Sequence, residues 1–219
     1  MGEIHKYTTN IADIIGWSHY LCSEVLSTGD MAVDLTLGNG RDCLHLARSV
    51  GARTAGGVLG FDIQHEALQR SASLLAEHEF VTCIHTDATR DSLVARTEPY
   101  PDVTTGVHLF HSGHQDLHRH LQRAPKVVLG NLGYLPGGDH NISTTASTTL
   151  SAVKQGLAAL MPKGRLILVA YPGHPTGKHE ARDLSEYFTT LTKQEWDVIH
   201  IGCPNAAQAP LLLCAERRS

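Results

Sequence analysis

The fold follows from the stretch Met31-Ala32-Val33-Asp34-Leu35-Thr36-Leu37-Gly38-Asn39-Gly40. Its first half predicts a short apolar strand and its second half a glycine loop. We expect a helix over residues 42–50, because apolar side chains recur there on one side. Two glycines let the backbone approach a ligand, and the helix start offers free N–H groups. A plain tight turn would look the same, so this signal alone is weak.

A second strand and helix strengthen the interpretation. Residues 57–61 predict an apolar strand with Asp62 at its end, and residues 65–79 predict the next helix. Asp62 lies about twenty residues beyond the glycine loop, where a carboxylate can bind both ribose hydroxyls of a nucleoside cofactor. The unit therefore suits NAD or S-adenosylmethionine. The spacing G-x-G-x-x-G is absent, and Asp34 can accept from an ammonium group, so S-adenosylmethionine is favoured.

The third strand is ambiguous. Residues 81–85 are one candidate and residues 107–110 are the other, with a loop-like segment at 97–102 between them. Either the sheet has an extra strand here, or one run is a surface excursion. The loop after the third strand is usually near the adenine of the cofactor, so this question affects the site.

The rest of the chain continues the alternation of strands and helices. Further helices are expected at about 7–26, 115–122, 150–161 and 179–191, and further strands at 126–129, 165–170, 196–202 and 210–215. The last two strands should form an antiparallel pair. This order predicts one α/β domain over residues 1–219, with its N-terminal helix within 1–28, a Rossmann-like and mostly parallel sheet with an antiparallel edge strand, and helices on both faces.

The loop Asn131-Leu132-Gly133-Tyr134-Leu135-Pro136-Gly137-Gly138-Asp139 follows a short apolar strand. Four of its nine residues are Gly or Pro, so it continues neither as a strand nor as a regular helix. It carries an amide, an aromatic ring and a carboxylate. Ligands bind at the carboxyl ends of strands in open α/β sheets, so we expect this loop to present the substrate.

The length, the net charge and the residue composition of the chain argue against several classes of protein. The chain has 219 residues and a formal net charge of -4, so no global basic field indicates nucleic acid, although a local basic patch remains possible. No apolar run is long enough for a membrane span. The five cysteines are scattered and are expected to be reduced and buried. Histidines cluster at 111, 114, 118 and 120, but no Cys or Glu partner stands at a ligand spacing, so no metal site is expected.

Five groups of residues together indicate a protein family more specifically than the single motifs above. They are Asp34-x-Thr36-x-Gly38-Asn39-Gly40-x-Asp42; Phe61-Asp62-Ile63-Gln64; the loop 131–139; Thr144, Ser147 and Thr148; and Tyr171-x-Gly173-His174-Pro175-x-Gly177-Lys178-x-Glu180. With these motifs the chain resembles the class I S-adenosylmethionine-dependent methyltransferases. Within them it resembles a small family labelled as rRNA methylases and understood as tRNA 5-aminomethyl-2-thiouridine methyltransferases. The resemblance covers nearly the whole chain.

This resemblance implies methylation of the aminomethyl group on a wobble (2-thio)uridine of tRNA, giving 5-methylaminomethyl-(2-thio)uridine. The family has His-x-Ser-His where this chain has His111-Ser112-Gly113-His114. It also lacks most of about 86–106, so that segment is an atypical insertion and 107–110 is favoured as the third strand. With the resemblance, contacts to S-adenosylmethionine are expected from Asp34, Gly38, Asn39, Gly40, Asp42, Asp62, Gln64, Gly113, His114 and Asn131.

Methyl transfer to an amine needs an aligned, neutral nitrogen. The Asn131 side-chain oxygen and the Leu132 carbonyl can accept from the amine, and Tyr134 can stack on the pyrimidine. Asp139 or His174 can take the proton, and the choice between them stays open. Substrate contacts are expected from Tyr134, Pro136, Gly137, Gly138, Thr148, Tyr171, His174 and Lys178.

The expected partner is tRNA, through its anticodon stem-loop, and a homodimer is possible. Phosphate contacts are expected among Lys178, Arg182, Arg119, Arg123 and Lys126. A cytoplasmic protein is expected, or an organellar one if a targeting segment has been removed. Two alternatives stay open: methylation of rRNA or of a small-molecule amine, which the acidic net charge mildly favours, and a non-catalytic module that binds S-adenosylmethionine.

Overall fold

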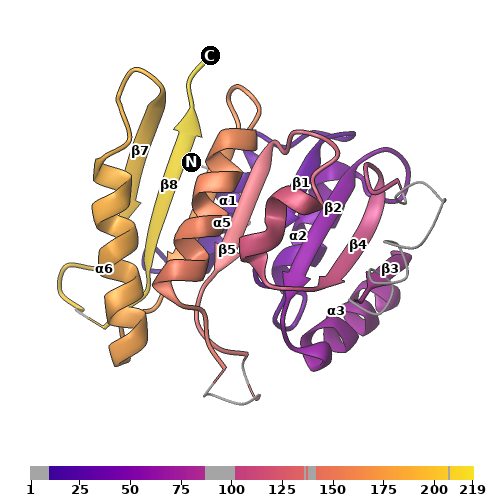
Figure 1. The fold of residues 1–219 in the computed structure, drawn as a ribbon, viewed down its shortest axis with the longest axis horizontal. Helices are drawn as coiled ribbons and strands as arrows, with labels where there is room; N and C mark the ends of the chain where they lie inside the picture. Colours follow the sequence, from indigo (N-terminus) through magenta and orange to yellow (C-terminus); the bar gives the residue numbers. More distant parts are fainter. Residues whose placement is uncertain (1–9, 87–101, 136, 138–141, 207) are drawn as a thin grey trace.

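The computed structural model describes residues 10–86, 102–135, 137, 142–206 and 208–219. Its strands form one eight-stranded sheet in the order β3-β4-β2-β1-β5-β6-β8-β7 (Figure 1). The strands are β1 (Met31–Asp34), β2 (Gly57–Asp62), β3 (Thr82–His85), β4 (Gly106–His111), β5 (Val127–Asn131), β6 (Arg165–Ala170), β7 (Trp196–Ile201) and β8 (Leu211–Arg217).

The central strands are parallel, and only β8 reverses direction against its neighbours β6 and β7. The carboxyl ends of the parallel strands therefore meet at one edge, which is the lower edge in Figure 1. All four residues of β1 are buried, as expected for a strand covered on both faces. The Rossmann-like fold with an antiparallel pair at one edge, predicted from the sequence, is confirmed.

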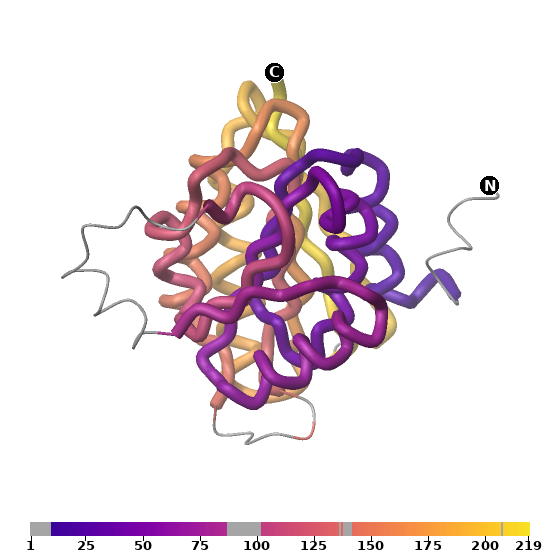
Figure 2. Tube along the Cα trace, turned by 90° about the vertical axis from the view of Figure 1, so that its right-hand side faces the viewer, coloured from indigo at the N-terminus to yellow at the C-terminus, as the bar shows by residue number. Residues whose placement is uncertain are grey.

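Helices cover both faces of the sheet (Figures 1 and 2). The helices α1 (Ile14–Ser23), α2 (Arg41–Val50) and α3 (His65–Glu77) pack on one face. The 3-10 helix η2 (His114–Arg119) and the helices α5 (Ala146–Ala159) and α6 (Pro175–Thr189) pack on the other. None of the helices in the described ranges is long and apolar enough to cross a membrane.

Both candidates for the third strand are strands. β4 pairs directly with β2, and β3 pairs with the outer side of β4. The run 107–110 therefore takes the third-strand position beside β2, as the sequence favoured, and the run 81–85 supplies an additional edge strand. Cys83, predicted to be buried, is exposed because it lies in this edge strand. The expected insertion at about 86–106 lies mostly outside the described residues.

Three helix starts differ from the prediction. The helix expected at about 150 is α5, which begins at Ala146 because the side chain of Thr145 caps it by accepting from Thr148 N. Within the described residues α1 begins at Ile14, because Asp13 caps it by accepting from Gly16 N at 2.9 Å. Ile11, which the periodicity placed on its inner face, is 87% exposed. The third helix, α6, begins at Pro175, four residues earlier than expected, because proline suits the first helical position.

Arg165, the first residue of β6, links α1 to β8 by hydrogen bonds. Its Nη1 donates to the backbone oxygen of Leu21 in α1, and its Nε donates to Glu216 Oε2 in β8, both at 2.8 Å. The same helix contacts β6 and β8. The position of α1 therefore depends on residues that come much later in the chain.

Candidate active site

The glycine loop after β1 carries two residues in the left-handed region. Gly38 has φ 50° and Gly40 has φ 80°. A Cβ atom at position 40 would lie 2.7 Å from Ser71 Cα in α3, whereas one at position 38 would meet nothing closer than 3.9 Å. Gly40 therefore allows α3 to pack closely, whereas an added Cβ at Gly38 would make only ordinary van der Waals contacts. Gly40 also stands at the start of α2, whose first N–H groups face this edge.

Asp62 ends β2 and is held by two backbone groups. Gly38 N donates to its Oδ2 at 3.1 Å, and Gln64 N donates to its Oδ1 at 2.9 Å. Burial raises the pKa of Asp62, and these N–H donors lower it in part. The carboxylate is thus fixed next to the glycine loop. Ile63, the next residue, is 55% exposed and offers an apolar surface beside it.

Asp34 ends β1 and is completely buried. Its Oδ1 accepts from Thr36 N at 3.0 Å, but no described residue donates to its Oδ2. Burial raises the pKa of Asp34 well above its usual range, and the negative charge of nearby Asp42 raises it further. Two buried carboxyl groups that repel each other in this way are stabilised by a cation or a strong hydrogen-bond donor between them.

Asn131 ends β5 beside these carboxyl groups. Its backbone N–H donates to Thr36 Oγ1 at 2.8 Å, and its Nδ2 donates to Asp42 Oδ2 at 3.3 Å. Asn131 Oδ1 is buried and receives no hydrogen bond from the described residues. Tyr171, at the end of β6, has a pKa raised by burial and by the charge of Asp42, against a smaller lowering by a hydrogen bond from Asn131.

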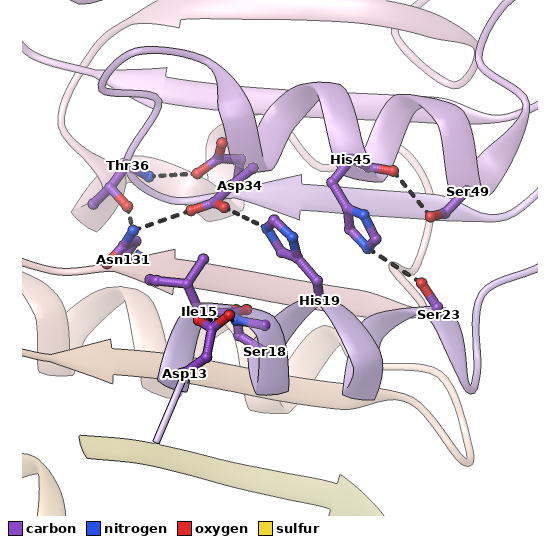
Figure 3. Close-up of polar contacts among 12 residues, drawn as sticks. Asp13, Ile15, Ser18, His19, Ser23, Asp34, Thr36, His45, Ser49 and Asn131 are labelled. Carbon is purple, nitrogen blue, oxygen red and sulfur yellow. Dashed lines mark hydrogen bonds and ion pairs between the residues drawn. The ribbon is translucent and has the colours of Figure 1, made fainter. Parts of the chain in front are cut away.

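His19 was not found from the sequence. Its Nε2 lies 2.7 Å from Asp42 Oδ1, and its ring stacks on His45 with centroids 4.1 Å apart. Burial and then the neighbouring His19 lower the pKa of His45 to about 4. Figure 3 shows His19 extending from α1 toward the end of β1, with Asn131 beside Thr36. The helical period of α1 gives no sign of this contact, because the partner lies 23 residues away.

The loop after β4 lies against the loop after β2. Ser112 N donates to the backbone oxygen of Asp62 at 3.0 Å, and the ring nitrogen His111 Nε2 lies 2.9 Å from Ile63 O. His114 is buried, and its Nδ1 donates to Leu35 O at 3.1 Å. Burial lowers the pKa of His114, and no described residue bonds to its Nε2. The structure thus places this loop, which carries the predicted cofactor residues Gly113 and His114, next to the loop that begins at Asp62.

Asn39 and Gln64 complete the predicted cofactor set. Asn39 Oδ1 accepts from Arg70 Nη1 of α3 at 3.1 Å. Gln64 precedes α3 in an extended conformation and makes no capping bond with its side chain. Both residues lie near Asp62, because the backbone N–H groups of Gly38, which precedes Asn39, and of Gln64 itself donate to that carboxylate.

The loop after Asn131 is tied to α5 and α6. Gly133 N donates to Thr144 Oγ1 at 3.0 Å, and this hydroxyl donates to Glu180 Oε2 at 2.7 Å. The other oxygen of Glu180 accepts from Thr149 at 2.6 Å. Burial raises the pKa of Glu180, and the two threonine hydroxyls lower it in part. Glu180 therefore anchors the start of the loop from the first turns of α6.

The predicted substrate residues are placed unevenly. Tyr134 is 42% exposed, and its ring centroid lies 6.1 Å from that of His174. The backbone of Leu132 bonds to β6 and its side chain is buried. Gly137 is exposed. The hydroxyl of Thr148 bonds back to Thr145 O at 3.1 Å at the start of α5. Pro136, Gly138 and Asp139 lie outside the described residues.

His174 caps α6. Gly177 N donates to its Nδ1 at 3.1 Å, so the neutral ring carries its proton on Nε2. Lys178 is exposed in the first turn of α6. Lys126, predicted to lie near the active edge, precedes β5 at the opposite edge of the sheet, and its Nζ donates to Pro162 O at 3.0 Å. Within the described ranges no three His, Cys, Asp or Glu side chains gather as metal ligands do.

Comparison with known proteins identifies the family. Residues 58–217 match the sequence model of the family described as "Putative rRNA methylase". The chain belongs to this family. It is also 31% identical over 206 residues to the chloroplastic tRNA (mnm(5)s(2)U34)-methyltransferase of Arabidopsis thaliana. The aligned region covers 92% of this chain and 68% of the plant protein.

Two solved structures of methyltransferases are also similar to this chain, and the first of them is named as an rRNA methylase. The Clostridium thermocellum protein matches with a TM-score of 0.76 and 32% identity, over 93% of this chain and 97% of that one. A Streptococcus mutans methyltransferase in complex with SAH (S-adenosylhomocysteine) matches with a TM-score of 0.73 and 25% identity, with the same coverage. The chain is thus an S-adenosylmethionine-dependent methyltransferase of the rRNA methylase family.

The edge described above fits this cofactor. S-adenosylmethionine carries an ammonium group, a sulfonium group and ribose hydroxyls. The buried Oδ2 of Asp34 and the carboxylate of Asp42 suit the cationic end, and Asp62 suits the ribose. The close approach at Gly40 keeps the loop between them compact.

Proposed function

We propose that this methyltransferase transfers a methyl group to the aminomethyl nitrogen of a (2-thio)uridine at the wobble position of tRNA, giving 5-methylaminomethyl-(2-thio)uridine. The observation that carries the proposal is the buried Oδ1 of Asn131, an acceptor with no described donor at the start of a loop with an exposed aromatic ring. An amine nitrogen satisfies such an acceptor. The name of the Arabidopsis relative supports the choice of amine.

The cofactor supplies an electrophilic methyl group, which forms the new N–C bond while the S–C bond breaks and the sulfonium becomes a neutral thioether. We assign Asp34 and Asp42 to the cationic end of the cofactor and Asp62 to its ribose. Gly38 and Gly40 form the backbone wall between them. Further contacts are assigned to Asn39, Gln64, Gly113 and His114, because all of them lie at the same edge.

Asn131 holds the amine. Thr36 fixes its backbone and Asp42 fixes its Nδ2, so its Oδ1 lies on the side of the amide that faces away from Asp42. That oxygen and the Leu132 carbonyl accept from the amine N–H groups and direct the nitrogen lone pair. The nitrogen must be neutral when it reacts, so one proton leaves before or during transfer.

The base is assigned to Asp139 rather than to His174. The Nδ1 lone pair of His174 accepts from Gly177 N, and Nε2 carries the proton in the neutral ring. The neutral imidazole therefore presents a donor to the site and has no free lone pair for the proton. Protonating Nδ1 would break the cap of α6. Asp139 lies outside the described residues, so this assignment rests on the loop sequence.

The RNA side of the site consists of Tyr134 and its neighbours. The half-exposed Tyr134 ring is assigned to stack on the uracil, with His174 and Tyr171 beside it. Pro136, Gly137 and Gly138 let the nucleotide approach the loop. Lys178 is assigned to a backbone phosphate of the anticodon stem-loop. Thr148 belongs to the same set through its place at the start of α5.

The cellular setting follows from the same proposal. A tRNA-modifying enzyme acts where tRNA is present, in the cytoplasm or in an organelle. The Arabidopsis relative is named as chloroplastic, which supports the organellar choice when a targeting segment has been removed. Assembly as a homodimer is part of the proposal.

The proposal is tested with purified protein, methyl-labelled S-adenosylmethionine and tRNA from a strain that lacks this methylation. The tRNA is digested, and its nucleosides are separated and identified by mass. We expect label in 5-methylaminomethyl-(2-thio)uridine and nowhere else. Label in rRNA or in a small-molecule amine, with none in the wobble nucleoside, would replace the tRNA assignment. Cofactor binding without transfer to any of these acceptors would indicate a non-catalytic module.

The role of Asn131 has its own test. Asn131→Ala should abolish turnover, because the amine loses its acceptor, while S-adenosylhomocysteine affinity measured by calorimetry stays within about threefold, which is less than one hydrogen bond. A large loss of cofactor affinity would mean that Asn131 belongs to the cofactor site instead.

A further inference from the structure

His19 connects α1 to the reacting edge through a chain of three side chains. His19 Nε2 lies 2.7 Å from Asp42 Oδ1, and Asn131 Nδ2 lies 3.3 Å from the other oxygen, Asp42 Oδ2. The side chain of Asp42 is only 10% exposed and that of His19 is 20% exposed. Both oxygens of Asp42 are therefore engaged, one by each neighbour.

The direction of this chain fixes the amide. An ionised carboxylate only accepts hydrogen bonds, so Asp42 requires the NH2 group of Asn131 to face it. The Oδ1 atom must then point the other way, where no described residue satisfies it. If the Asp42 side chain rotated away, the Asn131 amide could turn over and present its NH2 group to the substrate. That group would donate to the lone pair of the amine nitrogen instead of accepting from its N–H groups.

His19 is itself held in place. Its ring lies parallel to the ring of His45, with an interplanar angle of 4°, and His45 Nε2 lies 3.2 Å from Ser23 Oγ in α1. Asp42 stands in the first turn of α2, where the helix start favours its negative charge. Figure 3 shows these contacts between α1 and α2 in one layer, with His19 on the side of Asn131 and His45 on the far side.

We propose that His19 is a positioning residue, which donates to Asp42 and thereby keeps the amide oxygen of Asn131 facing the substrate amine. This inference rests on the role proposed above for Asn131. His19 touches neither the substrate nor the methyl donor in this assignment, and it acts through Asp42 alone. The sequence motifs contain Asp42 and Asn131 but not His19, which reaches them from a helix outside the motifs.

Two variants at position 19 and one control test the inference in the full-length protein. His19→Ala removes the donor, and we expect kcat to fall between about tenfold and a hundredfold, as for a misplaced reacting group, with KM for tRNA within about twofold. His19→Gln keeps an N–H donor at a similar reach and should restore kcat to within about threefold. Ser23→Ala removes the 3.2 Å contact between Ser23 Oγ and His45 Nε2 but leaves the ring of His45 stacked on that of His19. It is therefore the matched control for the docking of α1, and kcat should stay within about twofold of wild type, less than the loss of one hydrogen bond.

A second measurement needs no substrate and keeps the inference separate from the proposed function. The side-chain NH2 signals of Asn131 are identified in an NMR spectrum by their loss in Asn131→Ala. We expect their exchange with water to be about tenfold faster in His19→Ala than in wild type, the factor for one lost hydrogen bond, and to return in His19→Gln. If the wild type fails to methylate the wobble uridine, the proposed function falls while this comparison still decides the role of His19.

Any of four results would overturn the inference. The first three are an unchanged Asn131 amide in His19→Ala, an equal loss of kcat in Ser23→Ala, and no recovery in His19→Gln. The second would mean that docking of α1, and not the bond to Asp42, is what matters. A rise in the dissociation constant for S-adenosylmethionine with unchanged kcat would also overturn it, because His19 would then act on the cofactor side of Asp42.

Discussion

Gly40→Ala should destabilise the fold by two separable effects. The residue has φ 80°, and a side chain in that left-handed region costs about 1–2 kcal/mol. The new Cβ would also lie 2.7 Å from Ser71 Cα and 2.9 Å from Ser71 Cβ, and such overpacking costs about 1–3 kcal/mol. Together the variant should lose about 2–5 kcal/mol of unfolding free energy, which lowers the Tm by about 4–20 °C for a chain of this length.

Gly29→Ala is the matched control for the backbone effect. Gly29 has φ 94°, but its added Cβ would meet nothing within 4 Å. This variant should lose only the conformational part, about 1–2 kcal/mol. Both variants are compared with wild type by urea and thermal unfolding followed by circular dichroism. The difference between them measures the contact with α3.

Adding Ser71→Gly to Gly40→Ala sharpens the comparison. It removes the Cβ and Oγ atoms that would lie 2.9 Å away and leaves the Cα atom at 2.7 Å, so recovery should be partial. Equal losses in Gly40→Ala and Gly29→Ala, with no recovery in the double variant, would refute the packing argument. The contact with α3 would then add nothing to the loss of unfolding free energy caused by a side chain at a left-handed position.

Three further predictions concern the carboxyl groups. Asp62→Asn should weaken S-adenosylhomocysteine binding by roughly tenfold or more in calorimetry, because its NH2 group would face a backbone N–H. Burial raises the pKa of Asp62 in the wild type, so acidifying the solution should begin to weaken cofactor binding at a higher pH than an ordinary Asp would give. Glu180→Gln should flatten the pH dependence of Tm. The pKa of Glu180 in the folded wild type is raised above 4.5, so its contribution to stability is fully present at pH 4.5 and below and is lost as the pH rises through the raised pKa. The Gln variant does not titrate and should show no such loss. Thr144→Val should cost about 1.5–3 kcal/mol in urea unfolding, because Glu180 and the Gly133 N–H each lose a partner; a loss below about 0.5 kcal/mol would contradict the anchoring role.

The sequence predicts the elements of this fold well, because strand and helix periods are local. The strand 31–34, the glycine loop and Asp62 were all found in this way. The start of α1 was wrong, since Ile11 keeps the apolar spacing but stands ahead of the Asp13 cap. The third strand stayed open because two short runs competed, and only pairing with β2 distinguishes them.

The candidate site was predicted where side chains follow strand ends, because parallel strands bring those ends together. Asp34, Asp62 and Asn131 are of this kind. His19 was missed because it reaches the site from the side of a helix, and helix periodicity says which face is buried but not which side chain it meets. The position of Lys126 was wrong because closeness in sequence to Asn131 hides the length of strand β5 between them.

The fastening of α1 by Arg165 has a consequence for the order of folding. Leu21 precedes Arg165 by 144 positions, and the second partner, Glu216, comes later still in β8. During synthesis on the ribosome, α1 emerges long before its anchors do. It must wait, or dock provisionally, until the reversed strand has been inserted between β6 and β7. On the role proposed for His19, we therefore expect the contact between His19 and Asp42, and with it full activity, only once β8, the last of the described strands, has formed.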